Sequence, residues 1–131
     1  GIYELNQTVT GASGCTSISL ASNLLRVATA HSNGNLLIYQ ATNNTFSNGS
    51  PPSTNASASP KTSVSFNPNT LILSVINGNK GLELYYLNPN NGKWVYNPNQ
   101  PTPPPANSFS QDWANANEIG VGTANNSEVE G

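Results

Sequence analysis

The side chains of this sequence that could form a binding site are its aromatic residues. A Trp or Tyr ring offers an apolar face on which a pyranose can stack. Tyr86, Trp94 and Trp113 are candidates for such a face, and the many Asn side chains supply amide donors and acceptors. Trp94 follows an Asn-Gly turn, so we expect it to present a ring to a ligand, whereas Tyr39 and Tyr85 should pack inside the protein.

No motif in the sequence indicates catalysis. The carboxylates are Glu4, Glu83, Asp112, Glu118, Glu128 and Glu130, and their spacing identifies no acid and base pair. No Gly-rich phosphate loop precedes a helix, and one His with one Cys cannot complete a zinc site. We therefore predict a protein that is not an enzyme and that uses no cofactor and no metal.

The single His and the single Cys are both expected to have structural positions. His31 lies in a hairpin tip rich in Asn and Gly, which predicts a solvated turn residue. Cys15 has no second cysteine for a disulfide within the chain and is expected to be a small buried residue.

Composition narrows the class of protein. Only 8 % of the 131 residues are charged, the net charge is −2, and the four basic residues are scattered, so we predict no nucleic-acid partner. The longest apolar runs are about five residues, too short for a membrane span. β-Branched and aromatic residues occur in short runs between clusters of Asn, Gly, Pro and Ser, which is typical of an all-β protein.

An internal repeat defines the architecture. Residues 16–20, TSISL, recur as residues 62–66, TSVSF, at an offset of 46. The same offset, without a gap, aligns Leu36, Ile38 and Tyr39 with Leu82, Leu84 and Tyr85. Strands are expected at 17–20, 24–30 and 36–41, and at 63–66, 70–76, 82–87 and 93–96, with Asn-Gly hairpin tips between them. Four strands in about 46 residues make one β-propeller blade.

A third, weaker copy follows at an offset of 94. Trp113 aligns there with Ser19, and Ile119 with Leu25. Residues 1–8 resemble the third strand of a unit, so we predict that the N-terminal strand completes the last blade. The predicted division is a single all-β domain with 1–13 as the end of a blade, 14–57 and 58–106 as blades, and 107–131 as the start of a blade. Residues 47–60 and 97–107 show no periodicity and are expected to be linkers.

Three blades are too few to close a propeller, because known rings have about four to eight. Three accounts are open. Two or more copies could close one ring, the chain could be a piece of a longer propeller, or complementary ends could exchange strands head-to-tail and form filaments.

The repeating unit resembles a blade of the fungal and bacterial fucose-binding lectins, the six-bladed propeller family typified by the orange-peel mushroom lectin. The matching segments are Leu25-Arg26-Val27, the hairpins Asn33-Gly34 and Asn77-Gly78, Asn91-Gly92-Lys93-Trp94, and Trp113. The resemblance implies a sugar site in which Arg and Glu bind hydroxyls and Trp stacks on the ring. Arg26 and Glu83 therefore join Tyr86, Trp94 and Trp113 as the five candidate ligand-binding residues.

The match to that site is incomplete in this sequence. Arg26 fills the Arg position, but the alignment places Ile72 and Gly120 there in the other copies. Glu83 lies two residues from the Glu position, on the same strand and face as Tyr85. Fucose specificity is therefore not carried over.

Asn-x-Ser/Thr sequons indicate the compartment. They begin at Asn6, Asn43, Asn48, Asn55 and Asn125. With few charges and no initiating Met, they favour a secreted glycoprotein. The sequence thus predicts a secreted, lectin-like propeller protein or propeller segment that binds glycans. The alternative is a structural glycoprotein that self-assembles into rings or filaments.

Overall fold

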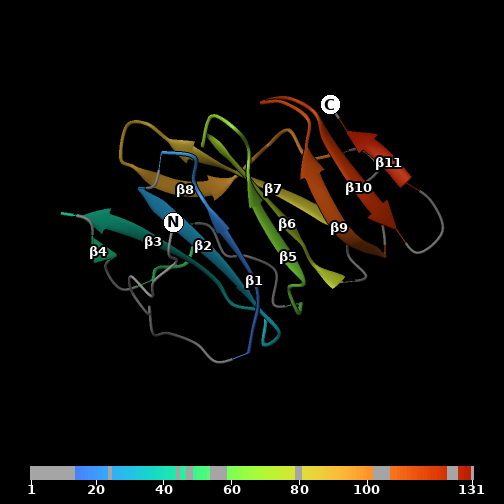
Figure 1. Ribbon diagram of the computed structural model, residues 1–131, viewed down its shortest axis with the longest axis horizontal. Helices are drawn as coiled ribbons and strands as arrows, with labels where there is room; N and C mark the ends of the chain where they lie inside the picture. Colours follow the sequence, from blue (N-terminus) through green and yellow to red (C-terminus); the bar gives the residue numbers. More distant parts are fainter. Residues whose placement is uncertain are drawn as a thin grey trace, which may run out of the picture.

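A computed structural model of the chain describes residues 14–23, 25–43, 45–46, 49–53, 59–78, 81–101, 107–123 and 127–130. These residues form three antiparallel sheets, called blades 1, 2 and 3 in chain order, and blade 2 lies between blades 1 and 3 (Figure 1). Blade 1 contains β1 (Cys15–Leu20), β2 (Arg26–His31), β3 (Leu36–Thr42) and β4 (Thr45–Phe46). Blade 2 contains β5 (Ser63–Phe66), β6 (Ile72–Ile76), β7 (Leu82–Asn88) and β8 (Lys93–Tyr96). Blade 3 contains β9 (Ser108–Trp113), β10 (Ile119–Thr123) and β11 (Ser127–Glu130).

The predicted fold class is confirmed. Blades 1 and 2 are four-stranded sheets whose strands pair in chain order, as in a propeller blade. Leu20 pairs with Val27 in blade 1, and Phe66 pairs with Leu73 in blade 2, so the offset of 46 is also a structural equivalence. The predicted completion of the last blade by the N-terminal strand falls on residues 1–13, outside the described residues.

Asparagine makes many of the turns between these strands. Its side-chain oxygen accepts a hydrogen bond from the backbone N–H two residues ahead, which stabilises a turn without help from a second strand. Among the described residues seven asparagines do this, at distances of 2.8–3.2 Å: Asn23, Asn33, Asn69, Asn88, Asn91, Asn97 and Asn115. These side-chain oxygens therefore stabilise the turns of the fold.

The third copy is a blade, but the gapless alignment gave it the wrong register. Trp113 pairs with Ile119, so these residues are equivalent to Leu20 and Val27, not to Ser19 and Leu25. The offset from Leu20 to Trp113 is 93 and that from Val27 to Ile119 is 92, so no single gapless offset fits both strands. The turn between the two strands accounts for the difference. It is closed by Ala21 N–H to Arg26 C=O in blade 1 but by Ala114 N–H to Glu118 C=O in blade 3, one residue shorter.

That correction changes two further equivalences. The position of Arg26 is taken in blade 3 by Glu118, not by Gly120. Gly120 instead takes the position of Ala28, because both stand one residue after the paired residue of the second strand.

The innermost strands β1, β5 and β9 pack in succession. Between blades 1 and 2 lies an apolar cluster of Ala21, Ala28, Ala30, Leu36, Val64, Phe66, Leu73, Val75, Tyr85 and Trp94. This first interface also has polar contacts, since the backbone N–H groups of Val64 and Phe66 donate to the hydroxyls of Ser17 and Ser19 at 3.2 and 3.0 Å. The serines of the repeated TSISL segment thus join neighbouring blades.

The second interface, between blades 2 and 3, is made differently. Its apolar cluster contains Ile76, Leu82, Ile119 and Val121, with Leu84 and Trp113 packed against it. The Gln111 amide donates to Ser63 Oγ at 3.0 Å and also bonds to Ser74 Oγ, which accepts from Trp113 Nε1 at 3.1 Å. At the second interface, side chains of blade 3 therefore bond to serine hydroxyls of blade 2. At the first interface, serine hydroxyls of blade 1 accept from the backbone of blade 2.

Burial confirms one expectation about single residues and overturns two. Tyr39 and Tyr85 are buried, as predicted. His31 is not a solvated turn residue: it ends β2, is 2 % exposed, and bonds through Nε2 to Thr29 Oγ1 at 2.8 Å. It shares the face of Val27 and Thr29 because the strand runs one residue further than expected. Cys15 opens β1 at the edge of its sheet and is exposed, not buried.

No helix in the described part of the chain is long and apolar enough to cross a membrane.

Candidate functional site

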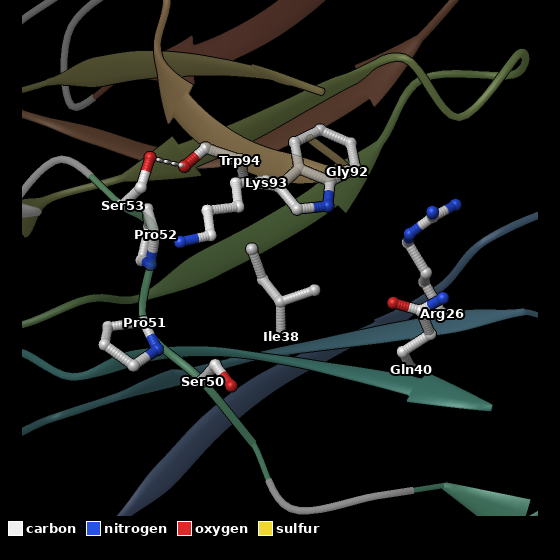
Figure 2. A pocket seen from close by; sticks show the side chains of 10 residues that line it. All are labelled: Arg26, Ile38, Gln40, Ser50, Pro51, Pro52, Ser53, Gly92, Lys93 and Trp94. Carbon is white, nitrogen blue, oxygen red and sulfur yellow. Dashed lines mark hydrogen bonds between the residues drawn. The ribbon is translucent and has the colours of Figure 1, made fainter. Parts of the chain in front are cut away.

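A cleft of about 490 Å³ lies between blades 1 and 2, and we call it cleft A. Its lining residues are Arg26, Ile38, Gln40, Ser50, Pro51, Pro52, Ser53, Gly92, Lys93 and Trp94. Figure 2 shows Ile38 near the centre, Arg26 and Gln40 on one side, and Lys93 with the two prolines on the other. Cleft A therefore has an apolar middle and polar or charged side chains around it.

The wall from blade 1 is built by two paired strands. Arg26 begins β2 and pairs with Gln40 of β3, so their side chains lie side by side on one face of the sheet. Ile38 precedes Gln40 by two residues and shares that face, because side chains alternate along a strand. The register of one hairpin thus places all three at cleft A.

Residues 49–53 form the connecting wall, although the sequence predicted a linker there. Ser50 and Ile38 exchange two backbone hydrogen bonds, of 2.7 and 3.0 Å, and Ser53 N–H donates to Trp94 C=O at 2.8 Å. The segment therefore ties β3 of blade 1 to β8 of blade 2. Gly49 allows this close approach, since a Cβ there would lie 2.7 Å from the Tyr39 ring.

The wall from blade 2 is the start of β8. Gly92 has a φ of 69°, a left-handed conformation that favours glycine, and its N–H closes a turn on Asn88 C=O at 2.8 Å. Lys93 and Trp94 follow at once. Lys93 is exposed, and its side chain reaches toward Pro52 in Figure 2.

Trp94 has a more structural position than the sequence predicted. It lines cleft A, but it is only 5 % exposed and packs on Phe66, with ring centroids 5.5 Å apart and planes tilted by 57°. Its indole N–H is buried and has no hydrogen-bond partner in the described part of the chain. The ring therefore offers a ligand little surface, because nearly all of it is buried in the first interface.

An equivalent cleft, cleft B, lies between blades 2 and 3 and measures about 280 Å³. Its lining residues are Ile72, Leu84, Asn97, Asn99, Gln100, Pro101, Trp113, Asn117 and Ile119. Ile72 and Leu84 stand 46 residues after Arg26 and Ile38, so cleft B repeats the site with an apolar residue in place of the arginine.

The two clefts close their walls by different means. Ile38 pairs with the backbone of Ser50, whereas the equivalent Leu84 pairs with a side chain. Gln100 Oε1 accepts from Leu84 N–H at 2.8 Å, and Gln100 Nε2 donates to Leu84 C=O at 2.7 Å. Leu84 C=O also accepts from Asn97 N–H at 2.9 Å, so the Gln100 amide bonds to Leu84 together with one backbone group.

Glu83 lines neither cleft. Its Oε2 accepts a hydrogen bond of 2.9 Å from the Tyr85 hydroxyl, and Tyr85 meets Tyr96 edge-on at 5.8 Å. Burial, and then the negative charge of Glu83, raise the pKa of Tyr85 far above its ordinary 10.0. The same two causes raise the pKa of Tyr96. Glu83 is therefore positioned to bond a tyrosine, away from Arg26.

Of the five candidate ligand residues, two meet at one cleft. Arg26 and Trp94 line cleft A, Trp113 lines cleft B, and Glu83 and Tyr86 line neither. Sequence reasoning missed Gln40, Lys93 and the wall at 49–53. Lys93 could have been predicted, because it directly follows the Asn91-Gly92 turn on which the prediction of Trp94 was based.

The other predicted sites are placed only in part. Asn43 is exposed, with a φ of 51° in the turn before β4, while Asn6, Asn48, Asn55 and Asn125 lie outside the described residues. No cluster of three His, Cys, Asp or Glu side chains occurs within the ranges that the structure describes.

Comparison with known proteins shows the fold alone. No protein-family model matches the sequence, and no curated protein has significant similarity to it. Kluyveromyces lactis Hsv2p aligns with a TM-score of 0.58 and 12 % identity, over 92 % of this chain and 43 % of its own. KlAtg21, in complex with the coiled coil of AgAtg16, aligns with a TM-score of 0.56 and 12 % identity, over 84 % of this chain and 35 % of its own.

Both similar structures are β-propellers, and this chain spans less than half the length of either. With its four-stranded repeats in chain order, the chain has the fold of a β-propeller segment.

Proposed function

We propose that this chain is a non-enzymatic, lectin-like β-propeller segment that binds a carbohydrate in cleft A. One observation carries the proposal: Arg26 and Trp94, 68 positions apart and on different blades, meet at a single cleft. Sugar sites combine an apolar surface with a few directed polar groups, and Ile38 with the prolines, Arg26 and Gln40 supplies both. The resemblance to the fucose-binding lectins supports the same function, without its sugar specificity.

A glycan array with wild-type protein and two variants tests this function. We expect saturable binding that is lost in Arg26→Ala and kept in Ile72→Ala, which changes the equivalent position of cleft B. Trp94→Phe is a better probe than Trp94→Ala, because it retains a ring against Phe66. Wild-type protein that binds no glycan across the array would overturn the proposal.

Secretion and glycosylation belong to the same proposal. Asn43 supports them, since its sequon lies on an exposed turn that an oligosaccharide could occupy. Expressed through a eukaryotic secretory pathway, the protein should lose mass on treatment with an N-glycosidase, and Asn43→Gln should lose less. Secreted protein of unmodified mass would contradict this part.

Self-association is a second candidate function, and a specific surface favours it. Ile18 and Leu20 of β1 are 58 % and 54 % exposed, whereas their equivalents Val64 and Phe66 are 4 % and 7 % exposed against blade 1. The equivalent pair is buried between blades in the second copy. A pair of large apolar side chains that is exposed at this position in the first copy is typical of an interaction site.

We infer that a second copy of this chain covers this pair, through its blade 3. Within one chain, Val64 and Phe66 pack with Ala28 and Ala30 in the first interface. Gly120 and Gly122 take those two positions in blade 3, so they leave equal or greater room for large side chains. The sequence also predicted head-to-tail assembly by exchange of the strand at residues 1–8, and those residues lie outside the described part of the chain.

Native mass as a function of concentration tests self-association. Wild-type protein should form dimers or larger particles, and Leu20→Asp should be monomeric. Leu71→Asp is the matched control, because Leu71 is 51 % exposed but lies in the turn before β6. A wild-type protein that stays monomeric up to millimolar concentration would refute this candidate.

A further inference from the structure

Cleft A concentrates positive charge on a chain that is acidic as a whole. The sequence has four Lys and Arg residues and a net charge of −2, yet two of the four, Arg26 and Lys93, line this one cleft. They come from blades 1 and 2 and are 67 positions apart, so only folding brings them together.

Neither cation is neutralised within the part of the chain that the structure describes. No carboxylate lines cleft A, and no ion pair joins Arg26 or Lys93 to a described carboxylate. Glu83 instead accepts a hydrogen bond from Tyr85, and Glu118 accepts one of 2.9 Å from the Asn115 amide. Two cations in a partly enclosed site, without counter-charges, favour an anionic ligand.

The geometry of the cleft indicates where the anion would be bound. A guanidinium offers a planar fork of donors that suits a carboxylate or sulfate, while an ammonium acts as a compact point charge. In Figure 2 the two cations flank the apolar Ile38 from opposite sides, with the rings of Pro51 and Pro52 on the side of Lys93. A sugar ring over Ile38 could therefore direct acidic substituents to both sides.

We propose that cleft A selects acidic carbohydrates, those that carry carboxylate or sulfate groups, over neutral ones. This inference rests on the carbohydrate site proposed above and adds its ligand class. The departure from the fucose-binding lectins has a physical basis, because an Arg with a Glu suits neutral hydroxyls, whereas Arg26 with Lys93 suits negative charge.

A matched pair of oligosaccharides tests the inference: tetragalacturonic acid and its fully methyl-esterified form, which has the same rings without the charge. We expect the acid to bind at least about tenfold more tightly than the ester, because each lost charge-assisted contact costs about a factor of ten or more. A sulfated chondroitin tetrasaccharide separates the two sources of charge, since tighter binding than the uronate would assign the site to sulfate.

Variants locate the effect. Arg26→Gln and Lys93→Gln should each weaken binding of the acid about tenfold and binding of the ester by less, so that the ratio of the two affinities falls in both variants. Ile72→Gln in cleft B is the control and should change neither. Affinity for the acid should also fall as salt is raised from 50 to 500 mM, because ions screen exposed charges.

The outcomes separate this inference from the function on which it rests. Equal binding of acid and ester, or preference for a neutral glycan, overturns acidic selectivity and leaves carbohydrate binding in place. Absence of binding to every acidic and neutral glycan overturns both. If Arg26→Gln and Lys93→Gln bind the acid as tightly as the wild type does, the binding site is not cleft A and the inference is refuted.

Discussion

Clefts A and B occupy equivalent places in successive repeats and differ in what their side chains can do. At the same strand position, cleft A has Arg26 and cleft B has Ile72. Cleft A takes its outer wall from a peptide segment with exposed Lys93 nearby, while cleft B closes on the amide of Gln100. The strand positions that line the site are therefore the same in both repeats, while the side chains at those positions differ.

The interfaces beneath the clefts differ in the same way. The first is the larger apolar cluster and holds Trp94 and Tyr85. The second is smaller, and Trp113 there is half-buried and bonded to Ser74. Each interface has its own tryptophan, so the fluorescence of Trp94→Phe and Trp113→Phe variants reports on one interface at a time.

The largest expected effect distinguishes the two tryptophans. Trp94→Ala should lower the free energy of unfolding by about 3–5 kcal/mol, because it removes a buried ring packed on Phe66. Trp113→Ala should cost clearly less, since that ring is half-buried. Urea unfolding of both variants measures the difference. Equal losses would mean that the interfaces are energetically alike.

High pH should weaken the first interface before the second. The pKa of Tyr85 is raised in the folded protein, mainly by burial, so folding favours its neutral form. That contribution is complete below the unfolded value of 10.0 and is lost progressively as pH rises above it. Trp94 fluorescence, followed from pH 9 to 12, should therefore change before that of Trp113.

Tyr85→Phe is the control for this titration. It removes the ionising hydroxyl while retaining the ring, so the alkaline change at Trp94 should move to higher pH. If the variant titrates like the wild type, Tyr85 does not cause the transition.

Gln100 should contribute to the stability of the protein, because its side-chain amide bonds to the backbone of Leu84 at cleft B. Gln100→Ala leaves Leu84 N–H without its acceptor, while Leu84 C=O keeps its bond of 2.9 Å from Asn97 N–H. The unpaired N–H should destabilise the protein by about 1–3 kcal/mol. Gln100→Glu keeps an acceptor for Leu84 N–H but loses the donor to its C=O, so it should fall between Ala and wild type. Thermal unfolding measures the order, and a neutral Gln100→Ala would contradict the role.

The smallest effect concerns the serines of the repeated segment. Ser19→Ala removes the acceptor of Phe66 N–H in the first interface and should cost about 1 kcal/mol. Ser65→Ala is the matched control in the next copy, because its hydroxyl bonds only to the adjacent Phe66 C=O, at 3.5 Å, among the described contacts. Chemical denaturation of both variants should show a loss for Ser19 alone.

Much of the fold could be predicted from sequence, because it is encoded locally. Alternating apolar residues and Asn-Gly tips define hairpins, and the echo of TSISL in TSVSF defines the period. The third copy was misaligned because no single gapless offset fits both of its strands, and a turn one residue shorter leaves little trace in a short, Asn-rich segment. His31 was misplaced because β2 runs one residue further than the hairpin tip predicts, which puts this side chain on the same strand face as Val27 and Thr29.

The site depended on contacts that no local pattern reveals. The sequence by itself determined the blades, their turns and the residue types, including Arg26 in one repeat and Ile72 in the next. Only the tertiary structure decided that Arg26 and Lys93 share a cleft, that Glu83 bonds to Tyr85, and that Trp94 is mostly buried. The physical reason is that blades meet through side chains far apart in the chain, and their neighbours are set by how whole sheets stack.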